Sequence, residues 1–352
     1  MSLPQWGVIF SFLWLFLGSR LPYLQAILFF GTDDPTHNTT APTGKLARAG
    51  WQWEGSWPFA LGTVIGPHHV VTGTHLKIDI GEIFRFRGLS YRTIGKAQLT
   101  GTDLEVFIID GHFPDFAPLS NTRREIGRPV MLFGRGGQKG APFEGRGWLI
   151  GAFDNLQRWG TNTVSDIIPN ERSSGGELLA MDFNPAAGND EGFFSAGDSG
   201  AGTFLLDRDG LWKLAGVNFG VDGPFTLDTN TPPFFAAIYD ARKLWIGFQG
   251  FQEWIPDGPN PLVARSFATR VSSHLSWLEA RRSDPRPADA IVLESSSNPA
   301  GNFSEEAAYA VDTTALEIRS LQSQAQRFYR IRGARHLTLV KVQDGVCLLH
   351  YN

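Results

Sequence analysis

Short apolar runs separated by turn residues dominate the chain from Trp51 onward. Runs such as "FALGTVIG", "LEVFIID" and "LWKLAGVNFG" have the length of strands, and long stretches with helical spacing are scarce. This pattern predicts an all-β protein built as a sandwich or a barrel. The main exception is residues 268–282, where Val271, Leu275 and Leu278 follow helical spacing and predict a helix.

The N-terminal end differs from this pattern. Residues 6–18, "WGVIFSFLWLFLG", are densely apolar, but the run is too short to span a bilayer comfortably and Arg20 follows it. We expect a secretory signal peptide over residues 1–26, although no Lys or Arg precedes the apolar run. The alternative is a buried N-terminal helix. With a signal peptide, the protein would be secreted or periplasmic, without stable membrane insertion once the signal is removed.

The C-terminal end predicts a unit of its own. Residues 283–288, "SDPRPA", predict a linker, and the runs "ALEIRSL" and "HLTLVKV" beyond it alternate with the period of strands. We expect a small β module over residues 289–352. Its stretch "VLESSSNPAGNFSEE" resembles modules that end secreted proteins of Verrucomicrobia and Planctomycetes. The module either covers a barrel edge as a stabilising extension or attaches the chain to a surface, a polymer or a partner.

Composition limits the classes to which the chain can belong. With 352 residues, of which 42% are hydrophobic and 19% charged, it is long enough for roughly two or three domains and too apolar to be disordered. A net charge of -4 gives no reason to expect nucleic acid or an anionic membrane as a partner. The single cysteine, Cys347, excludes an intramolecular disulfide and a metal site of several cysteines. For an exported protein, this favours a bacterial source.

Two motifs suggest a metal or cofactor but do not support one. The adjacent histidines His68 and His69 follow Gly66 and Pro67, which favours a turn over a metal site. Residues 134–147, "GRGGQKGAPFEGRG", lack the spacing of a phosphate-binding loop and predict a Gly-rich surface loop. We therefore expect no metal and no cofactor.

The stretch "FFSAGDSGAGTF", residues 193–204, places Ser199 between glycines. It is either a surface turn or a nucleophilic serine held between backbone amides. A serine nucleophile needs a histidine base and a carboxylate that orients this base. His75 follows the apolar run "HVVTG", and Asp103 directly precedes "LEVFII".

Each of these residues also has an ordinary structural interpretation. His75 could be a hydrogen-bonded turn histidine, and Ser199 a turn serine. Asp103 could cap the start of a strand, with Glu105 or Asp110 as the functional carboxylate. The order His75, Asp103, Ser199 favours the catalytic interpretation for the set.

Five segments in the same order resemble the chymotrypsin-trypsin family of serine endopeptidases. They are "VVTGTHL", "DLEVFII", "GDSGAG", "LAGVNFG" and "FATRVSSHLSWLEA", and they cover residues from about 44 to 281. The resemblance implies a protease domain over residues 27–282 with two antiparallel six-stranded barrels, about 44–125 and 126–267, and a site in the cleft between them. It also implies hydrolysis of peptide bonds in proteins or peptides through an acyl-enzyme, without metal or cofactor.

The resemblance assigns roles to individual residues. Ser199 would be the nucleophile, His75 the general base and then acid, and Asp103 the residue that orients the imidazole. The N–H groups of Gly197 and Ser199 would form the oxyanion hole.

The resemblance also implies a support for the oxyanion hole. The carboxylate of Asp198 would lie buried against a positive charge. That charge would be either a new N-terminus at Ile27, freed by cleavage after Ala26, or a buried Arg or Lys.

The resemblance places a specificity pocket downstream of the triad. Phe193 would lie at its base, with Asn218, Phe219 and Gly220 on one wall and Ser266 on another. Because no acidic residue occupies the base, an Arg or Lys preference is not expected, and the Phe side chains favour a small or apolar substrate residue.

Two other classes of function compete with a protease. One is a catalytically inactive binding protein built on the protease fold, and the other is a surface adhesin that acts through residues 289–352. The intact set His75, Asp103 and Ser199 favours the enzyme.

Overall fold

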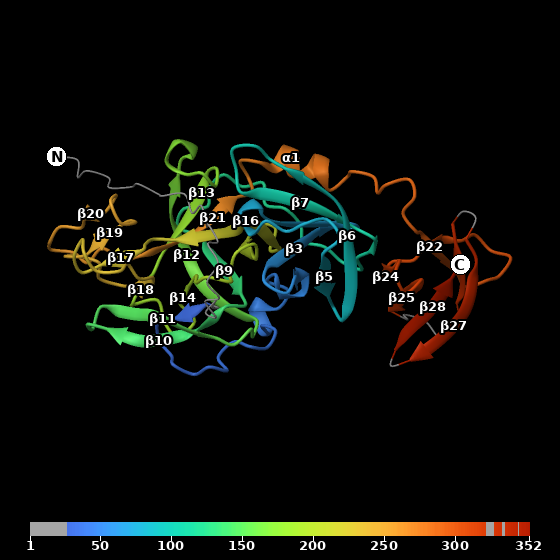
Figure 1. Ribbon diagram of the computed structural model, residues 1–352, viewed down its shortest axis with the longest axis horizontal. Coiled ribbons are helices and arrows are strands. Elements are labelled where there is room, and N and C mark those ends of the chain that lie inside the picture. Colours follow the sequence, from blue (N-terminus) through green and yellow to red (C-terminus); the bar gives the residue numbers. More distant parts are fainter. Residues whose placement is uncertain (1–26, 322–326, 333–334, 344) are drawn as a thin grey trace.

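The computed structural model describes residues 27–321, 327–332, 335–343 and 345–352 (Figure 1). Strands dominate these residues, and α1 (Leu275–Arg281) is the one α-helix among them. The described helices are too short to cross a membrane. The expected signal peptide, residues 1–26, lies outside the described part of the chain. Short 3₁₀ turns are η1 (Gly44–Leu46), η2 (Trp51–Trp53), η3 (Thr74–Leu76) and η4 (Asn170–Arg172).

The first barrel is built from the apolar runs that the sequence predicts as strands. Every residue of its strands β3 and β4 is buried, which explains why these runs are almost continuously apolar. The six strands close on themselves and leave no open edge. In order around the barrel they are β2 (Glu54–Ser56), β3 (Leu61–Gly66), β4 (His69–Gly73), β7 (Leu104–Ile109), β6 (Leu89–Gln98) and β5 (Ile83–Phe86).

The second barrel also closes with six antiparallel strands. Its longest strand, β12, alternates buried and more exposed residues along much of its length, the pattern of a strand with one face on a core. In order around the barrel the strands are β12 (Arg158–Ile168), β13 (Leu178–Asp182), β21 (Arg265–Arg270), β16 (Trp212–Val221), β15 (Gly202–Leu206) and β9 (Pro129–Gly134). The expectation of two antiparallel six-stranded barrels is therefore confirmed.

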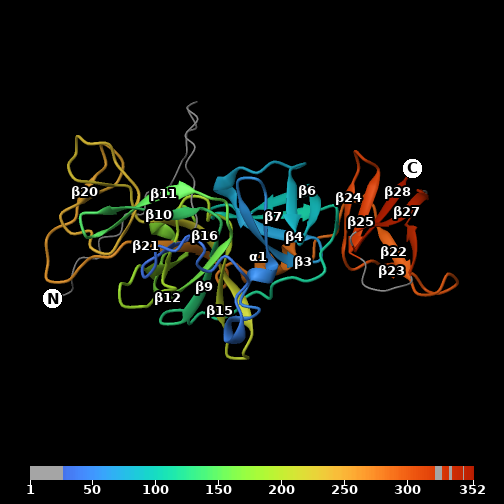
Figure 2. The same cartoon turned by 90° about the horizontal axis from the view of Figure 1, so that it is seen from below.

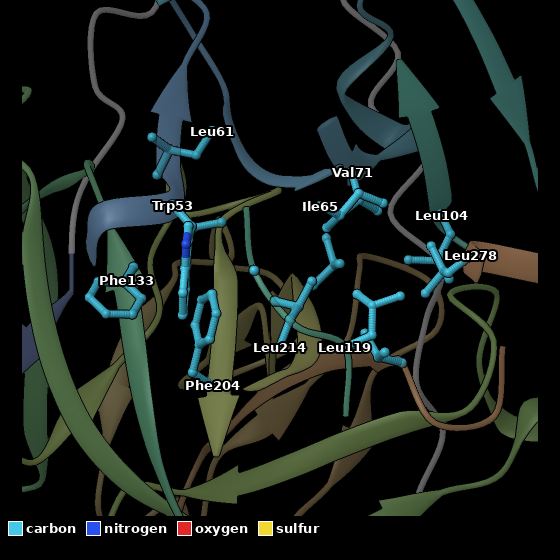
Figure 3. Close-up of a cluster of buried hydrophobic side chains, with 14 of the residues drawn as sticks. Trp53, Leu61, Ile65, Val71, Leu104, Leu119, Phe133, Phe204, Leu214 and Leu278 are labelled. Atoms are coloured by element: carbon cyan, nitrogen blue, oxygen red, sulfur yellow. The ribbon is translucent and has the colours of Figure 1, made fainter. Parts of the chain in front are cut away.

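A hydrophobic cluster joins the two barrels (Figure 3). Leu61, Val71 and Leu104 of the first barrel and Phe133 and Phe204 of the second belong to this cluster. Each such side chain contributes about 1.5–3 kcal/mol on burial, so the cluster fixes the barrels against each other. Leu61, Val71 and Leu104 lie on strands or strand ends that lead to the candidate site.

The C-terminal strands form two sheets, one of which includes β8, the short strand that follows β7 of the first barrel in sequence. In Figures 1 and 2 they lie at one end of the molecule, beyond the first barrel. Strand β24 pairs with β8, placing Tyr309 opposite His112 and Ala310 opposite Gly111. The two sheets have the order β27 (Leu337–Gln343), β28 (Val346–Tyr351), β25 (Glu317–Leu321), β24 (Tyr309–Asp312), β8 (Gly111–His112), and β23 (Ser304–Glu305), β22 (Leu293–Ser296), β26 (Phe328–Ile331).

Smaller sheets decorate the second barrel. Strand β1 pairs with β14. One three-stranded sheet consists of β17, β19 and β20 from the segment between β16 and β21, and the other pairs β18 from that segment with the hairpin of β10 and β11. These strands are β1 (Leu28–Phe29), β14 (Gly192–Phe193), β10 (Gly137–Phe143), β11 (Gly147–Phe153), β18 (Ala236–Ile238), β17 (Phe225–Thr226), β19 (Trp245–Ile246) and β20 (Glu253–Trp254).

Two sequence predictions were wrong in detail. The helix expected over residues 268–282 begins only at Leu275, because residues 268–270 complete β21 in the second barrel. The Gly-rich segment expected as a surface loop forms most of β10, which pairs with β11 despite its glycines. Sheet pairing supplies hydrogen bonds there that local composition does not reveal.

Candidate active site

Two paired strands bring His75 and Asp103 together. His75 lies in η3, directly after β4, and Asp103 directly precedes β7. Because β4 and β7 are antiparallel, with Gly73 opposite Leu104, the end of one strand meets the start of the other. The imidazole Nδ1 of His75 lies 2.7 Å from Oδ2 of Asp103.

The second oxygen of Asp103 is also held. Its Oδ1 accepts hydrogen bonds of 2.9 Å from both the backbone N–H of His75 and the hydroxyl of Thr74. A carboxylate accepts only, so Nδ1 of His75 carries the hydrogen and Nε2 is left as the basic nitrogen. The alternative carboxylates are elsewhere: Glu105 contacts Gln98 and Lys96, and Asp110 is not bonded to His75. Asp103 is therefore the carboxylate that faces the imidazole.

Ser199 lies on a loop between β14 and β15 that packs against the first barrel. Its carbonyl accepts a hydrogen bond of 3.4 Å from the N–H of Leu61. The next residue, Gly200, has φ +84°, and a Cβ there would clash with the Thr72 hydroxyl and the Leu61 carbonyl. This close approach brings the Ser199 loop to the strand end that carries His75. Among the described residues, the Ser199 hydroxyl has no hydrogen bond to His75.

Asp198, beside Ser199, is fully buried and held by backbone amides. Its carboxylate accepts hydrogen bonds from the N–H groups of Ser195 at 2.8 Å, Arg135 at 3.0 Å and Gly136 at 3.2 Å. Burial raises the pKa of Asp198 well above its ordinary value, against the opposing effect of these bonds. Gly134 makes the arrangement possible, because a Cβ there would overlap the Asp198 carboxylate.

Neither expected positive charge lies against this carboxylate in the described part of the chain. The Arg135 guanidinium turns away to the Ser56 hydroxyl and the Asn155 carbonyl. Ile27 packs in an apolar cluster beside Gly160 and Gly192. In the uncleaved chain, backbone N–H groups take the place of the cation. In the sequence, this close approach of backbone N–H groups to Asp198 is indicated by the glycines in "FGRGG", which directly follow the buried run "VMLF".

Strand order and closure of both barrels decide the fold, with the Ser199 loop packed between them. The barrels have the chymotrypsin-like fold. No protein-family model matches the sequence, and no curated protein matches it.

Solved structures give two weak likenesses to the chymotrypsin-like barrels. The chain is similar to neuropsin, a serine protease expressed in the limbic system of mouse brain, with 11% identity and a TM-score of 0.42 over 66% of this chain and 96% of that one. It is also similar to a mutant of human heparin binding protein, with 14% identity and a TM-score of 0.43 over 71% of this chain and 100% of the other. The fold assignment rests on the strands of this chain itself.

Phe219 lies between His75 and a cavity. A shift of register between Asn218 and Gly220 leaves Phe219 as a bulge in β16. Its ring meets that of His75 edge-on, with 5.8 Å between centroids. Bulges near active sites commonly redirect a side chain in this way.

The cavity beside Phe219 and Gly220 has a volume of about 430 Å³. Its apolar lining includes Phe219, Val221 and Phe267. Its polar lining consists of Ser165, Asp166, Asp182, Asp222, Glu253 and Arg265. Asp222 is paired with Arg265 at 3.1 Å, which leaves more carboxylates than cations around the space.

Three residues expected in the specificity pocket serve the interior instead. Phe193 is fully buried against Phe183, because its strand pairs with β1 and turns the ring into a core. The Ser266 hydroxyl is buried and accepts a hydrogen bond from the N–H of Phe194. The Asn218 side chain is buried and donates to the carbonyls of Phe133 and Asp198. None of these three residues lines the cavity beside Phe219.

Proposed function

We propose that the protein is a secreted serine endopeptidase that uses Ser199, His75 and Asp103. The observation that carries the proposal is the His75–Asp103 pair, with an Nδ1–Oδ2 distance of 2.7 Å and with the other carboxylate oxygen held by Thr74 and the His75 N–H. This arrangement fixes the tautomer and the orientation of the imidazole, which is what a serine nucleophile requires of its base.

In the proposed reaction, Nε2 of His75 takes the proton of the Ser199 hydroxyl as its oxygen attacks the scissile carbonyl. The imidazolium is stabilised by Asp103 and then gives the proton to the leaving amine, which departs and leaves an acyl-enzyme on Ser199. Water, deprotonated by the same nitrogen, releases the acid. The Ser199 side chain forms its bond to His75 when substrate is bound, as catalytic hydrogen bonds often tighten only in the complex.

The N–H groups of Gly197 and Ser199 would stabilise the oxyanion. Gly197 has φ +95°, a conformation that suits glycine, and the loop is held in place by the buried Asp198. Two preorganised donors in a buried loop favour charge that develops on the carbonyl oxygen.

We further propose that the substrate runs past Phe219 and Gly220 and places a side chain in the adjoining cavity. The apolar wall supports the expected preference for an apolar residue, and the surplus of carboxylates disfavours an acidic one. A peptide-library cleavage profile measures this preference. Export rests on the predicted signal peptide, and N-terminal sequencing of the secreted chain tests it.

A fluorophosphonate probe tests the reaction class. The wild-type chain should be labelled covalently at Ser199, and Ser199→Ala should abolish the labelling while leaving the far-UV circular dichroism spectrum unchanged. Ser272→Ala is a matched control, because Ser272 is a buried serine whose hydroxyl already donates to Glu125. Absence of labelling in a folded wild-type chain would identify an inactive binding protein with this fold.

A further inference from the structure

Three potential metal ligands meet where the first barrel joins the C-terminal strands. His68 lies in the turn before β4, His112 ends β8, and Glu305 ends β23. One donor atom from each lies within 4.8 Å of the other two. The rings of His68 and His112 are perpendicular, with 4.9 Å between centroids. The cluster thus draws one ligand from the C-terminal module and two from the barrel.

Hydrogen bonds fix both imidazoles in the tautomer that binds metal. Nδ1 of His68 lies 2.7 Å from the Gly111 carbonyl. Nδ1 of His112 lies 2.9 Å from the Phe113 carbonyl and 3.0 Å from the Ala307 carbonyl. A carbonyl can only accept, so each Nδ1 carries the hydrogen and each Nε2 keeps its lone pair. Metal-binding histidines are typically oriented by this kind of bond from the second nitrogen.

Hydrogen bonds also orient the carboxylate of Glu305. Its Oε1 accepts hydrogen bonds from the Arg286 guanidinium and, at 2.8 Å, from the Tyr309 hydroxyl. Within the described residues, these partners are all on Oε1, and Oε2 makes no hydrogen bond. The carboxylate is therefore held in place by one oxygen while the other can bind a cation.

The surroundings of the cluster also suit a cation. The Arg286 guanidinium pairs with Glu305, so the carboxylate is held by a fixed partner while it faces the two imidazoles. All three side chains are only partly buried, so an ion can reach them from solvent.

We propose that His68, His112 and Glu305 bind a zinc ion that fastens the C-terminal module to the first barrel. Two imidazoles and one carboxylate are a ligand set that zinc prefers, with water in the fourth position. Tetrahedral zinc places its ligands about 3.3 Å apart, given metal–ligand bonds of roughly 2.0–2.1 Å. Zinc binding would draw the three ligand atoms, which lie within 4.8 Å of one another, to that spacing. The site adds to the β8–β24 pairing and is independent of the proposed peptidase activity.

Cobalt(II) titration of the full-length chain, stripped of metal with a chelator, tests the site. We expect one cobalt per chain with the intense visible absorption of a tetrahedral complex, displaced by one equivalent of zinc. His112→Gln and Glu305→Gln should each weaken binding by roughly 100-fold or more, because each removes a ligand, beyond the 10–100-fold typical of an orienting partner. Glu305→Gln keeps an oxygen for Arg286 and Tyr309, so it preserves the joint if His112→Gln misfolds.

The matched control is His350→Gln. His350 belongs to the same module and its Nε2 lies 3.7 Å from a Glu317 oxygen, but the pair has no third ligand among the described residues. Cobalt affinity should be unchanged in this variant. Zinc should raise the thermal unfolding midpoint of the wild type and not of Glu305→Gln. Absence of a tetrahedral spectrum in the wild type, or equal affinity in Glu305→Gln, would overturn the proposal.

Discussion

At the scale of single residues, local sequence and distant backbone contribute differently to the candidate site. His75, Asp103 and Ser199 could be predicted because each lies in a short segment with its own turn or strand signal. The partners of Asp198 could be predicted only in part, since Ser195 is three residues away but the N–H groups of Arg135 and Gly136 are more than 60 residues away. Almost every residue has a backbone N–H, so the amino-acid sequence does not reveal which of them bind a carboxylate. Only the glycines that allow Asp198 to approach these N–H groups can be recognised in the sequence.

Gly134→Ala tests whether the Asp198 contact supports the oxyanion hole. The added methyl group would overlap the buried carboxylate, which must move and carry the Gly197–Ser199 loop with it. We expect the rate of fluorophosphonate labelling to fall by roughly 100-fold, the effect of losing one oxyanion donor. Gly258→Ala is the control, because a Cβ at Gly258 meets nothing within 4 Å. Equal labelling rates in Gly134→Ala and Gly258→Ala would show that the Asp198 contact does not influence the reaction of Ser199.

At the scale of elements, β16 connects the Ser199 loop to the second barrel. Its residue Asn218 bonds to Gly200 and Ala201 through the backbone, and its side chain reaches Phe133 on β9 and the Thr203 hydroxyl on β15. The sequence predicted this strand correctly but not the direction of its side chains. The bulge at Phe219 shifts the alternation by one residue, so Phe219 faces His75 and Asn218 faces the interior. Alternation alone cannot locate such a shift.

Asn218→Ala should destabilise this connection. It leaves the Phe133 and Asp198 carbonyls and the Thr203 hydroxyl without their side-chain partner in a buried setting. We expect the free energy of unfolding to fall by roughly 2–5 kcal/mol, since an unsatisfied buried polar group costs about 1–3 kcal/mol. Urea denaturation measures the change. Asn121→Ala, at an exposed position, should change the free energy by less than about 0.5 kcal/mol, and a similar loss in both variants would contradict the assigned role.

At the scale of the whole molecule, contacts between units were the least predictable part of the structure. The sequence indicated two barrels and a C-terminal module, and left open whether the module covers a barrel edge. In the structure, β24 of the module pairs with β8, and Ala310 packs in the core of the first barrel. His68 illustrates the difficulty: its neighbour in sequence is His69, yet in space it meets His112 and Glu305. Pairings across roughly 40 to 240 residues leave no periodic signal in the chain.

Glu54 joins the two barrels and makes stability depend on pH. Its Oε1 accepts hydrogen bonds from Thr63 of the first barrel at 2.7 Å and from the N–H of Gly202 in the second at 3.1 Å. Burial raises the pKa of Glu54 to about 8 in the folded chain. Burial also raises the pKa of Glu191 to about 7 and that of Asp110 to about 6. All three groups hold protons more tightly when folded, so they act in the same direction.

The free energy of unfolding should therefore fall as pH rises from about 5 to 8. In this interval the folded chain binds more protons than the unfolded chain, and one proton corresponds to a slope of up to about 1.4 kcal/mol per pH unit. The contribution of Glu54 is complete below its unfolded pKa and is lost as pH rises through about 8. Urea denaturation at a series of pH values measures the curve.

Glu54→Gln isolates the contribution of the group between the barrels. Glutamine keeps a carbonyl oxygen for Thr63 and Gly202 but cannot ionise, so the variant should lose less stability than the wild type between pH 5 and 8. This interval lies between the ordinary pKa of a glutamate and the raised pKa of about 8. Glu144→Gln is the control, because Glu144 is half-exposed and its carboxylate lies 3.7 Å from Arg146. Its curve should follow that of the wild type. If Glu54→Gln also follows the wild-type curve, the carboxyl between the barrels is not the group that senses pH, and the slope comes from other buried carboxyls with raised pKa values, among them Asp198, Glu191 and Asp110.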